Sequence, residues 1–550
     1  FKQKTAYEIR LSLVGSEMCI RDSDGMVYFP MNGSARGLLV QNNEYTDDGL
    51  LFTDGTANWT AEKTNKSLNA HGVSIVEVSK QRGGQWRVMR PSAYGRRITG
   101  QTPIAIGGPA SGDLRLRTSA DPSGTLVLGT LNNCAMGYTP WGTYLACEEN
   151  FNGYFNRTAA VARTPLENRY GVSPFGNPGQ KYWTTHPRFN ADVERNEPNR
   201  FGWVVEIDPF NPESMPVKRT ALGRLKHEGA WVQEARDGRV VVYMGDDERN
   251  EYIYRYVSSD KWRKMIKRGE NPLDSGIIYV AKFSADGTGQ WLPLTPANPA
   301  LANWTLADIL INTRGAADAV GATMMDRPEW IDTFPDKLTA IATLTNNNRR
   351  GSTPASVNNA NGSTAGGSAR PPVDAANPRA INNYGHIITW SYYQDWTEPD
   401  FRWDIFALAG DPAVPAHGST ILGDKYGSPD GIYVAPSGRV WIQTDVSTST
   451  INEGVYAGFG NNQMLCADPA TRETRRFLVG PSQCEITGVF VTPDETTMFV
   501  GIQHPGEPAS ELSNPADPKK VSSWPDGAAG GRPRSACVVI TKDDGGAIGS

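Results

Sequence analysis

The side chains best able to do chemistry in this sequence are carboxylates, and one group of them adjoins a thiol. Cys147, Glu148 and Glu149 are consecutive and follow a run of strand-forming residues. Carboxylates are the ligands that hard cations such as calcium prefer, and carboxylates with one thiolate also suit iron. A core cysteine followed by two solvated glutamates is the alternative interpretation of the same three residues.

Other segments place an acid beside residues that allow close backbone approach or bind an anion. They are Lys226-His-Glu-Gly229, Arg327-Pro-Glu-Trp330, Ser428-Pro-Asp-Gly431 and Cys484-Glu-Ile-Thr-Gly488. The Arg327 guanidinium has the planar fork that binds phosphate in a bidentate manner. Taken one at a time, each segment is equally well a surface turn or a surface ion pair.

Several common catalytic classes lack their usual motifs. The chain has no G-x-S-x-G elbow, no G-x-x-x-x-G-K-[ST] loop and no H-E-x-x-H motif, and it has only 6 His. These absences argue against serine hydrolases, P-loop enzymes and zinc sites built from imidazole. With 54 Lys plus Arg against 59 Asp plus Glu, no basic surface for nucleic acid is expected. No apolar run approaches the ~18 residues of a membrane-spanning helix, so no membrane span is predicted.

The acids recur directly after short runs of strand-forming residues. One run leads into Glu148 and Glu149, a second, over 239–244, into Gly245-Asp-Asp247, and a third, over 439–444, into Asp445. Further strands are predicted at 203–207, 252–257, 277–283, 386–390, 498–502 and 537–541. Because no helical segments alternate with these strands, we predict an all-β fold, a β-propeller with long loop insertions and a few short helices. Acids at strand ends far apart in sequence would then meet in the central channel.

Residues 24–550 are predicted to form one domain. Residues 155–200, 306–325 and 351–379 are predicted to be insertions, the second with a short helix and the third a long loop of low complexity. Residues 1–23 end in Met18-Cys-Ile-Arg-Asp-Ser23, which resembles a translated sequencing adapter, and we exclude them from the fold. The five cysteines after residue 23 are compatible with two disulfides and one thiol, or with five free thiols.

Together the motifs resemble the bacterial PhoX family of alkaline phosphatases. The resemblance rests on the long run from Gly129 to Phe155, which contains Asn-Asn-Cys-Ala-Met-Gly-Tyr-Thr-Pro-Trp-Gly-Thr and Cys147-Glu-Glu-Asn. It extends through Lys226-His-Glu-Gly229, Gly245-Asp-Asp-Glu248, Arg327-Pro-Glu-Trp330, Ser428-Pro-Asp-Gly431, Trp441-Ile-Gln-Thr-Asp445 and Ile502-Gln-His-Pro-Gly-Glu507. The motifs follow the family order from about residue 24 onwards. One departure is Asn43, where the family tends to have histidine before the acid at Glu44.

The resemblance implies a six-bladed β-propeller and a secreted or periplasmic enzyme exported by the twin-arginine route, with its signal peptide missing from this chain. It implies ferric iron and calcium as cofactors, and hydrolysis of small-molecule phosphate monoesters by metal-assisted attack in the channel. Carried over by motif, Cys147 would bind iron, Glu228 and Glu329 would supply metal carboxylates, and Arg327, helped by Asn346, would orient the phosphate. The remaining candidate metal ligands are Glu44, Glu148, Glu149, Asp430 and Glu485. A monomer is expected.

Two alternatives use the same fold. The first is a secreted propeller that binds calcium or an anion without turnover, because a fold alone does not decide function. The second is another calcium-dependent propeller hydrolase of the phytase or lactonase type. Neither requires a thiolate in the channel, so bound iron separates both from the phosphatase.

Overall fold

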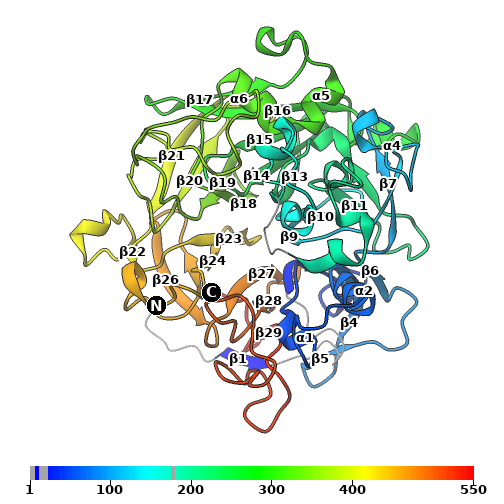
Figure 1. The fold of residues 1–550 in the computed structure, drawn as a ribbon. Helices are drawn as coiled ribbons and strands as arrows, with labels where there is room; N and C mark the ends of the chain where they lie inside the picture. Colours follow the sequence, from blue (N-terminus) through cyan, green and yellow to red (C-terminus); the bar gives the residue numbers. More distant parts are fainter. Residues whose placement is uncertain (1–6, 11–22, 175–179) are drawn as a thin grey trace.

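The computed structural model describes residues 7–10, 23–174 and 180–550. It is built mainly of strands, as predicted (Figure 1). Its α-helices are short and lie in the connections: α1 (Asp48–Leu51), α2 (Ala61–Ala70), α3 (Pro165–Arg169), α4 (Trp262–Lys267), α5 (Leu306–Ile311) and α6 (Thr313–Val320). The last two fill the insertion at 306–325, where a short helix is predicted. No helix among the described residues is long and apolar enough to cross a membrane.

Five antiparallel-rich sheets follow one another along the chain. The first has the order β2-β3-β4-β5, with β6 also on β4, and comprises β2 (Ser23–Pro30), β3 (Arg36–Asn43), β4 (Gly72–Lys80), β5 (Trp86–Val88) and β6 (Arg96–Ile98). The second has the order β8-β7-β12-β11-β10-β9 and comprises β7 (Pro103–Gly107), β8 (Leu126–Leu128), β9 (Asn133–Tyr138), β10 (Tyr144–Glu148), β11 (Val204–Ile207) and β12 (Val217–Arg219).

The third sheet has nine strands in the order β13-β14-β15-β16-β17-β21-β20-β19-β18. Its strands are β13 (His227–Glu234), β14 (Val240–Asp246), β15 (Ile253–Ser258), β16 (Gly276–Phe283), β17 (Thr288–Pro293), β18 (Pro328–Thr333), β19 (Thr339–Leu344), β20 (His386–Ser391) and β21 (Asp400–Leu408). The two halves of this sheet meet where β17 pairs with β21, in a short register from Thr288 opposite Arg402 to Gln290 opposite Asp400.

The last two sheets complete the chain. One has the order β22-β26-β25-β24-β23 and comprises β22 (Leu422–Gly423), β23 (Pro429–Val434), β24 (Val440–Thr444), β25 (Gln463–Ala467) and β26 (Glu473–Val479). The other has the order β1-β29-β28-β27 and comprises β27 (Glu485–Val491), β28 (Thr497–Gln503), β29 (Ala536–Lys542) and β1 (Tyr7–Arg10). Of the segment excluded as an adapter, residues 1–23, the structure describes only β1 and Ser23, which begins β2; the rest lies outside the described residues.

Six strands, each at an end of a sheet, contact one another in a ring. We call each of these strands, together with the strands that follow it in its sheet, a unit. Going round, β2 contacts β9, β9 contacts β13, β13 contacts β18, β18 contacts β23, β23 contacts β27, and β27 returns to β2. The sheets near the two ends of the chain therefore lie side by side (Figure 1). The sequence predicts the strands well, because 252–257, 277–283, 386–390, 498–502 and 537–541 correspond to β15, β16, β20, β28 and β29.

Two glycines allow the ring strands to approach closely near Asp24. A Cβ on Gly25 would lie 2.9 Å from the carbonyl oxygen of Cys134, and a Cβ on Gly488 would lie 2.6 Å from that of Asp24. A side chain at either position would push the neighbouring strand away. Glycine thus brings the polar ends of β2, β9 and β27 together.

Candidate metal centre

The ring strands carry a set of possible metal ligands at matching positions. The second residues of β2, β9, β13, β18 and β23 are Asp24, Cys134, Glu228, Glu329 and Asp430, and the first residue of β27 is Glu485. In several pairs a β-bulge follows, as between Glu228 and Trp231 and between Pro328 and Ile331. Bulges redirect side chains at the ends of strands, which suits a site at the centre of the ring.

A second set comes from the residue directly after the second strand of each unit. These residues are Glu44, Glu149, Asp247, Thr345, Asp445 and His504, which follow β3, β10, β14, β19, β24 and β28. The sequence predicts that acids after strands meet in a channel. In the structure each unit contributes from two positions, the start of its first strand and the residue after its second strand. Only the unit that begins at β18 has a side chain here, Thr345, that does not ionise.

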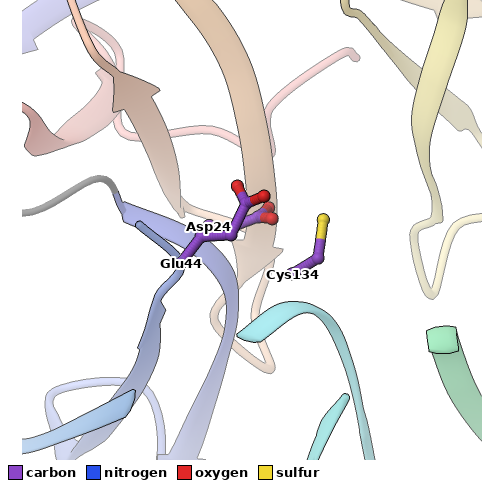
Figure 2. A group of neighbouring side chains, drawn as sticks. All are labelled: Asp24, Glu44 and Cys134. Carbon is purple, nitrogen blue, oxygen red and sulfur yellow. The ribbon is translucent and has the colours of Figure 1, made fainter. Parts of the chain in front are cut away.

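The two sets form one continuous cluster of acids with a single thiol. Within each of four groups, the possible ligand atoms lie within 4.8 Å of one another. The groups are Asp24, Glu44 and Cys134; Glu149, Glu228 and Asp247; Glu228, Glu329 and Asp430; and Asp430, Asp445 and Glu485. Figure 2 shows the carboxylates of the first group converging beside the Cys134 sulfur. Cys134 also donates to Glu228 Oε1 over 2.9 Å, which joins the first group to the others.

The electrostatics of the cluster call for cations. Burial raises the pKa of Glu149, Glu228 and Glu329 well above the usual value, and neighbouring carboxylates raise it further. Burial likewise raises the pKa of Asp24 to about 7. Glu149 Oε1, Asp430 Oδ1 and Asp24 Oδ2 are buried without a hydrogen-bond partner. Buried carboxylates in such numbers are costly unless they are paired or bind metal, so this donor set fits hard cations together with one ion that accepts a thiolate.

Arg327 is the cation that lies directly against this cluster. Its Nε and Nη2 donate to the two carboxylate oxygens of Asp247 over 2.8 and 2.7 Å, and Nη2 lies 3.3 Å from Glu329 Oε1. Burial acts to raise the pKa of Asp247, but the Arg327 guanidinium outweighs it and the pKa lies below its usual value. Arg327 has a φ of 59°, a backbone strain typical of functional positions. The structure therefore places the Arg327 guanidinium, a group able to bind an anion, against the acidic cluster.

Three other predicted residues lie at the edge of the cluster. Asn346 follows Thr345, and its Nδ2 lies 3.4 Å from Ser428 Oγ. Glu44 accepts a hydrogen bond of 2.6 Å from Gln503 Nε2. Glu44 and Glu485 also line a cleft of about 460 Å³, through which solvent reaches this side of the centre.

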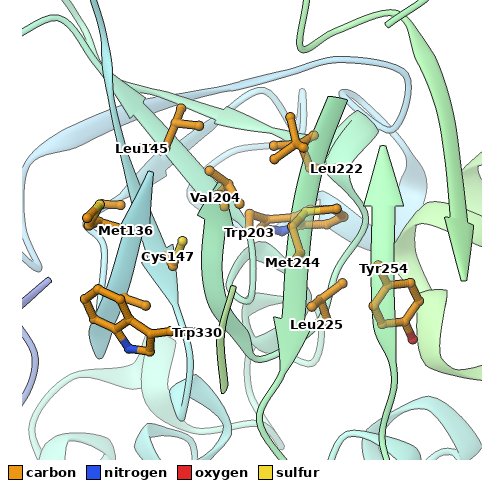
Figure 3. Packing of buried hydrophobic residues seen from close by; sticks show 14 of the residues in the cluster. Met136, Leu145, Cys147, Trp203, Val204, Leu222, Leu225, Met244, Tyr254 and Trp330 are labelled. Atoms are coloured by element: carbon orange, nitrogen blue, oxygen red, sulfur yellow. The ribbon is translucent and has the colours of Figure 1, made fainter. Parts of the chain in front are cut away.

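Cys147 is not brought into the cluster. It lies inside paired strand β10, opposite Val204, and is fully buried. Figure 3 shows its sulfur among apolar side chains that include Met136 and Trp330. Side chains alternate between the two faces of a strand, and the Cys147 side chain lies on the face that packs in the apolar core. The thiol in the cluster is that of Cys134, and the five cysteines of the described chain are all free.

Glu148 also serves a purpose other than the predicted one. Its Oε1 lies 2.6 Å from Lys218 Nζ, and both side chains are fully buried. Its Oε2 accepts from the backbone N–H groups of Gly202 and Trp203 over 3.0 and 3.1 Å. All its acceptor capacity is directed away from the cluster, so Glu148 fixes β10 against its neighbours and leaves the cluster to Glu149.

We predict that Lys218→Met destabilises the fold without emptying the metal centre. The change leaves the Glu148 carboxylate buried and unpaired, which costs about 3–5 kcal/mol. The free energy of unfolding, measured in denaturant, should fall by this amount, while the metal content of the folded protein stays that of the parent. Loss of metal at unchanged stability would instead show that Glu148 contributes to the metal centre.

The candidate ligands named from the sequence do not include Asp24, Cys134, Asp247 and Asp445, which belong to the cluster. Asp247 and Asp445 follow strands in the pattern that predicts channel acids, so the signal for them was present. Cys134 lies in the same family-like run as Cys147, and only the strand register separates the two. Asp24 directly follows the excluded segment, where no motif identifies it.

Comparison with known proteins identifies the family. The model of the alkaline phosphatase PhoX family matches residues 12–506. A solved structure of PhoX from Pseudomonas fluorescens, in complex with vanadate as a transition-state analogue, is 42% identical, covers 99% of this chain and 96% of its own, and has a TM-score of 0.88.

Other solved structures match with much lower sequence identity and structural similarity. A protein of unknown function from Dyadobacter fermentans is 9% identical, with a TM-score of 0.40 over 97% of this chain and 98% of its own. The GH93 α-L-arabinofuranosidase of Fusarium graminearum is 8% identical, with a TM-score of 0.31 over 96% and 98%. No curated protein sequence matches the chain significantly.

The family model and the Pseudomonas structure agree with the motifs and cover nearly the whole chain. They favour the phosphatase over the binding-only propeller and over the phytase-type or lactonase-type hydrolase. This chain belongs to the alkaline phosphatase PhoX family and is a phosphate-monoester hydrolase.

Proposed function

We propose that this phosphatase acts at the acidic cluster, with ferric iron and calcium as its cofactors. The observation that carries the proposal is the set of nine buried or half-buried carboxylates and one half-buried thiol contributed by strand ends all round the ring. Carboxylates suit calcium, and the single thiol suits iron. We assign the thiol ligand to Cys134 in place of Cys147. Glu149, Glu228, Glu329, Asp430, Glu485 and Glu44 remain proposed ligands, joined now by Asp24, Asp247 and Asp445.

Phosphoryl transfer requires positioning and compensation of negative charge rather than covalent work by the protein. When bound, the metal ions would supply most of the positive charge that the transition state needs. The residues of this chain would then orient the phosphate. Asp247 holds the Arg327 guanidinium by one edge, through Nε and Nη2, and so leaves the remaining donor groups of the fork for phosphate oxygens. Asn346, at the edge of the cluster, adds an amide donor.

We also propose that the sheets form six blades of a propeller. Six ring strands contact their neighbours in a closed circle, and the nine-stranded sheet divides into two blades where β17 meets β21. Residues 24–550 then form a single domain. The enzyme is proposed to act as a monomer in the periplasm or outside the cell, as the resemblance implies.

The test is phosphatase activity matched to metal content. Protein purified with iron and calcium should hydrolyse p-nitrophenyl phosphate, and chelation should reduce turnover by at least about a hundredfold, because the cluster would lose the charge that stabilises the transition state. Elemental analysis before and after chelation, with readdition of each metal alone, measures which ions are needed. Bis(p-nitrophenyl) phosphate, a diester, is the control and should be a poor substrate. Full turnover by protein free of both metals would contradict the proposal.

A further inference from the structure

A buried polar node lies behind Arg327 and holds several loops in place. At its centre is Asp326, which is fully buried. Its carboxylate accepts hydrogen bonds from Asn347 Nδ2, Arg350 Nε and Asn382 Nδ2 over 2.9, 2.8 and 3.0 Å. On the backbone, Asp326 pairs with Arg249 through an antiparallel bridge. The node thus fixes the main chain at the start of β18, after β14 and after β19.

Three arginines leave this node on adjacent chain segments. Arg327 follows Asp326 directly, Arg249 lies opposite it, and Arg349 precedes Arg350. Asn347 also donates to Asn250 Oδ1 over 2.8 Å, so the segments carrying Arg249 and Arg349 are tied to each other as well. The arginines are therefore held together by the fold rather than by chance contact of flexible side chains.

The acids around these arginines are already paired with other cations. Asp247 pairs with Arg327, Glu248 with Lys226, and Asp326 with Arg350. Among the described residues, neither Arg249 nor Arg349 forms an ion pair. The Arg349 guanidinium donates to the carbonyl oxygen of Ser368, over 3.3 Å. Two guanidinium groups thus remain without an ion-pair partner beside the phosphate-orienting arginine.

Of the two arginines, Arg249 gives the stronger indication of an anion site. It is half-buried, and its Nε is buried without a hydrogen-bond partner. A half-buried guanidinium that has no ion-pair partner and an unpartnered Nε favours an anion from outside.

We propose that Arg249, assisted by Arg349, binds a second anionic group of the substrate, beyond the phosphate that reacts. The inference rests on the proposed function and adds to it a substrate class: phosphate monoesters that carry a carboxylate or a further phosphate a few atoms from the ester. Arg327 orients the reacting phosphate, while Arg249 and Arg349 select the leaving group by its charge.

The test compares two esters that differ in one group. Glycerol 3-phosphate and 3-phosphoglycerate have the same phosphate ester, and only the second has a carboxylate. The parent enzyme should have a higher kcat/KM for 3-phosphoglycerate, and Arg249→Ala should reduce the ratio of the two kcat/KM values about tenfold, mainly through KM, because one charge-assisted contact is lost. Arg249→Lys should keep part of the preference, and Arg349→Ala should reduce it less. Arg263→Ala, at an exposed arginine on α4, is the matched control and should change nothing.

An unchanged ratio in Arg249→Ala, with glycerol 3-phosphate still hydrolysed, would overturn this inference and leave the proposed function intact. Absence of turnover with both esters in metal-loaded parent enzyme would overturn the two together. A ratio that falls equally in Arg263→Ala would also count against Arg249, because general surface charge would then explain the preference.

Discussion

Cys134→Ala should abolish both iron binding and phosphatase activity, whereas Cys147→Ala should retain both. The Cys134 sulfur lies among the acids of the cluster, 2.9 Å from Glu228 Oε1, and is the one thiol in the four groups of possible ligands. Loss of an outer partner of a metal ligand typically costs 10–100-fold in affinity or activity. Loss of the ligand itself should therefore reduce turnover of p-nitrophenyl phosphate by more than about a hundredfold.

Cys147 provides the contrast. Its side chain is packed among buried apolar residues, so removal of its sulfur creates a small cavity and should cost about 1–2 kcal/mol of stability. Iron content, determined by elemental analysis, and turnover per folded molecule should stay at the parent values. Cys466→Ala, at a half-buried thiol of β25, is a control for general effects of cysteine removal. The reverse pattern, an active Cys134 variant and an iron-free Cys147 variant, would restore the assignment made from sequence.

The metal-free protein should become less stable as the pH rises, and the effect should amount to several kcal/mol. Burial raises the pKa of Asp24 from 3.8 to about 7, and it raises that of Glu149, Glu228, Glu329, Asp430 and Glu485 as well. An acid with a higher pKa in the folded state holds its proton more tightly there than in the unfolded chain. Stability is thus full below the ordinary carboxyl pKa near 4, and it is lost as the pH rises towards 7 and above. For Asp24 alone, the loss corresponds to about 4 kcal/mol.

Urea denaturation of chelated protein at pH 5 and pH 8 measures this loss. Asp24→Asn should flatten the profile of the chelated protein between these values, whereas Asn at the exposed position Asp543 should not. With metals bound the slope should reverse, because cations favour the ionised carboxylates, and stability should then be lost on acidification. A metal-free protein that is equally stable at both pH values would show that these carboxylates do not face one another in solution.

Local sequence predicted the strands better than the choice among neighbouring side chains. The runs before Glu149, Asp247 and Asp445 indicate strands, and acids placed after strands do converge. Which of Glu148 and Glu149 enters the cluster depends on where β10 ends, and one residue decides the direction of a side chain. The partner of Glu148 is Lys218, which comes from another strand of the sheet. No motif near Glu148 reveals that contact, because it depends on how the strands are ordered in space.

The choice between Cys134 and Cys147 is a second case that local sequence does not decide. Cys134 and Cys147 lie in one run that resembles the family, and residue type alone favours the thiol followed by two glutamates. The bulge that interrupts the pairing of β9 with β10 gives Cys134 its place at the ring. A bulge inserts one extra residue into one strand of a pair and redirects side chains, which periodicity along one strand does not report.

The acidic centre takes ligands from every sheet, the first and the last included, and this has a consequence for biosynthesis. Gln503 donates to Glu44 across 459 residues of chain, and the proposed ligands Asp430, Asp445 and Glu485 are made after all the others. A growing chain can therefore offer only part of the donor set, and part of a site binds a metal ion far more weakly than the whole. Ions would be captured tightly only when the last sheet docks beside the first, so metal uptake would report that synthesis and folding are complete. Once captured, the ions would act as a clasp between the two ends of the chain and slow unfolding from either end.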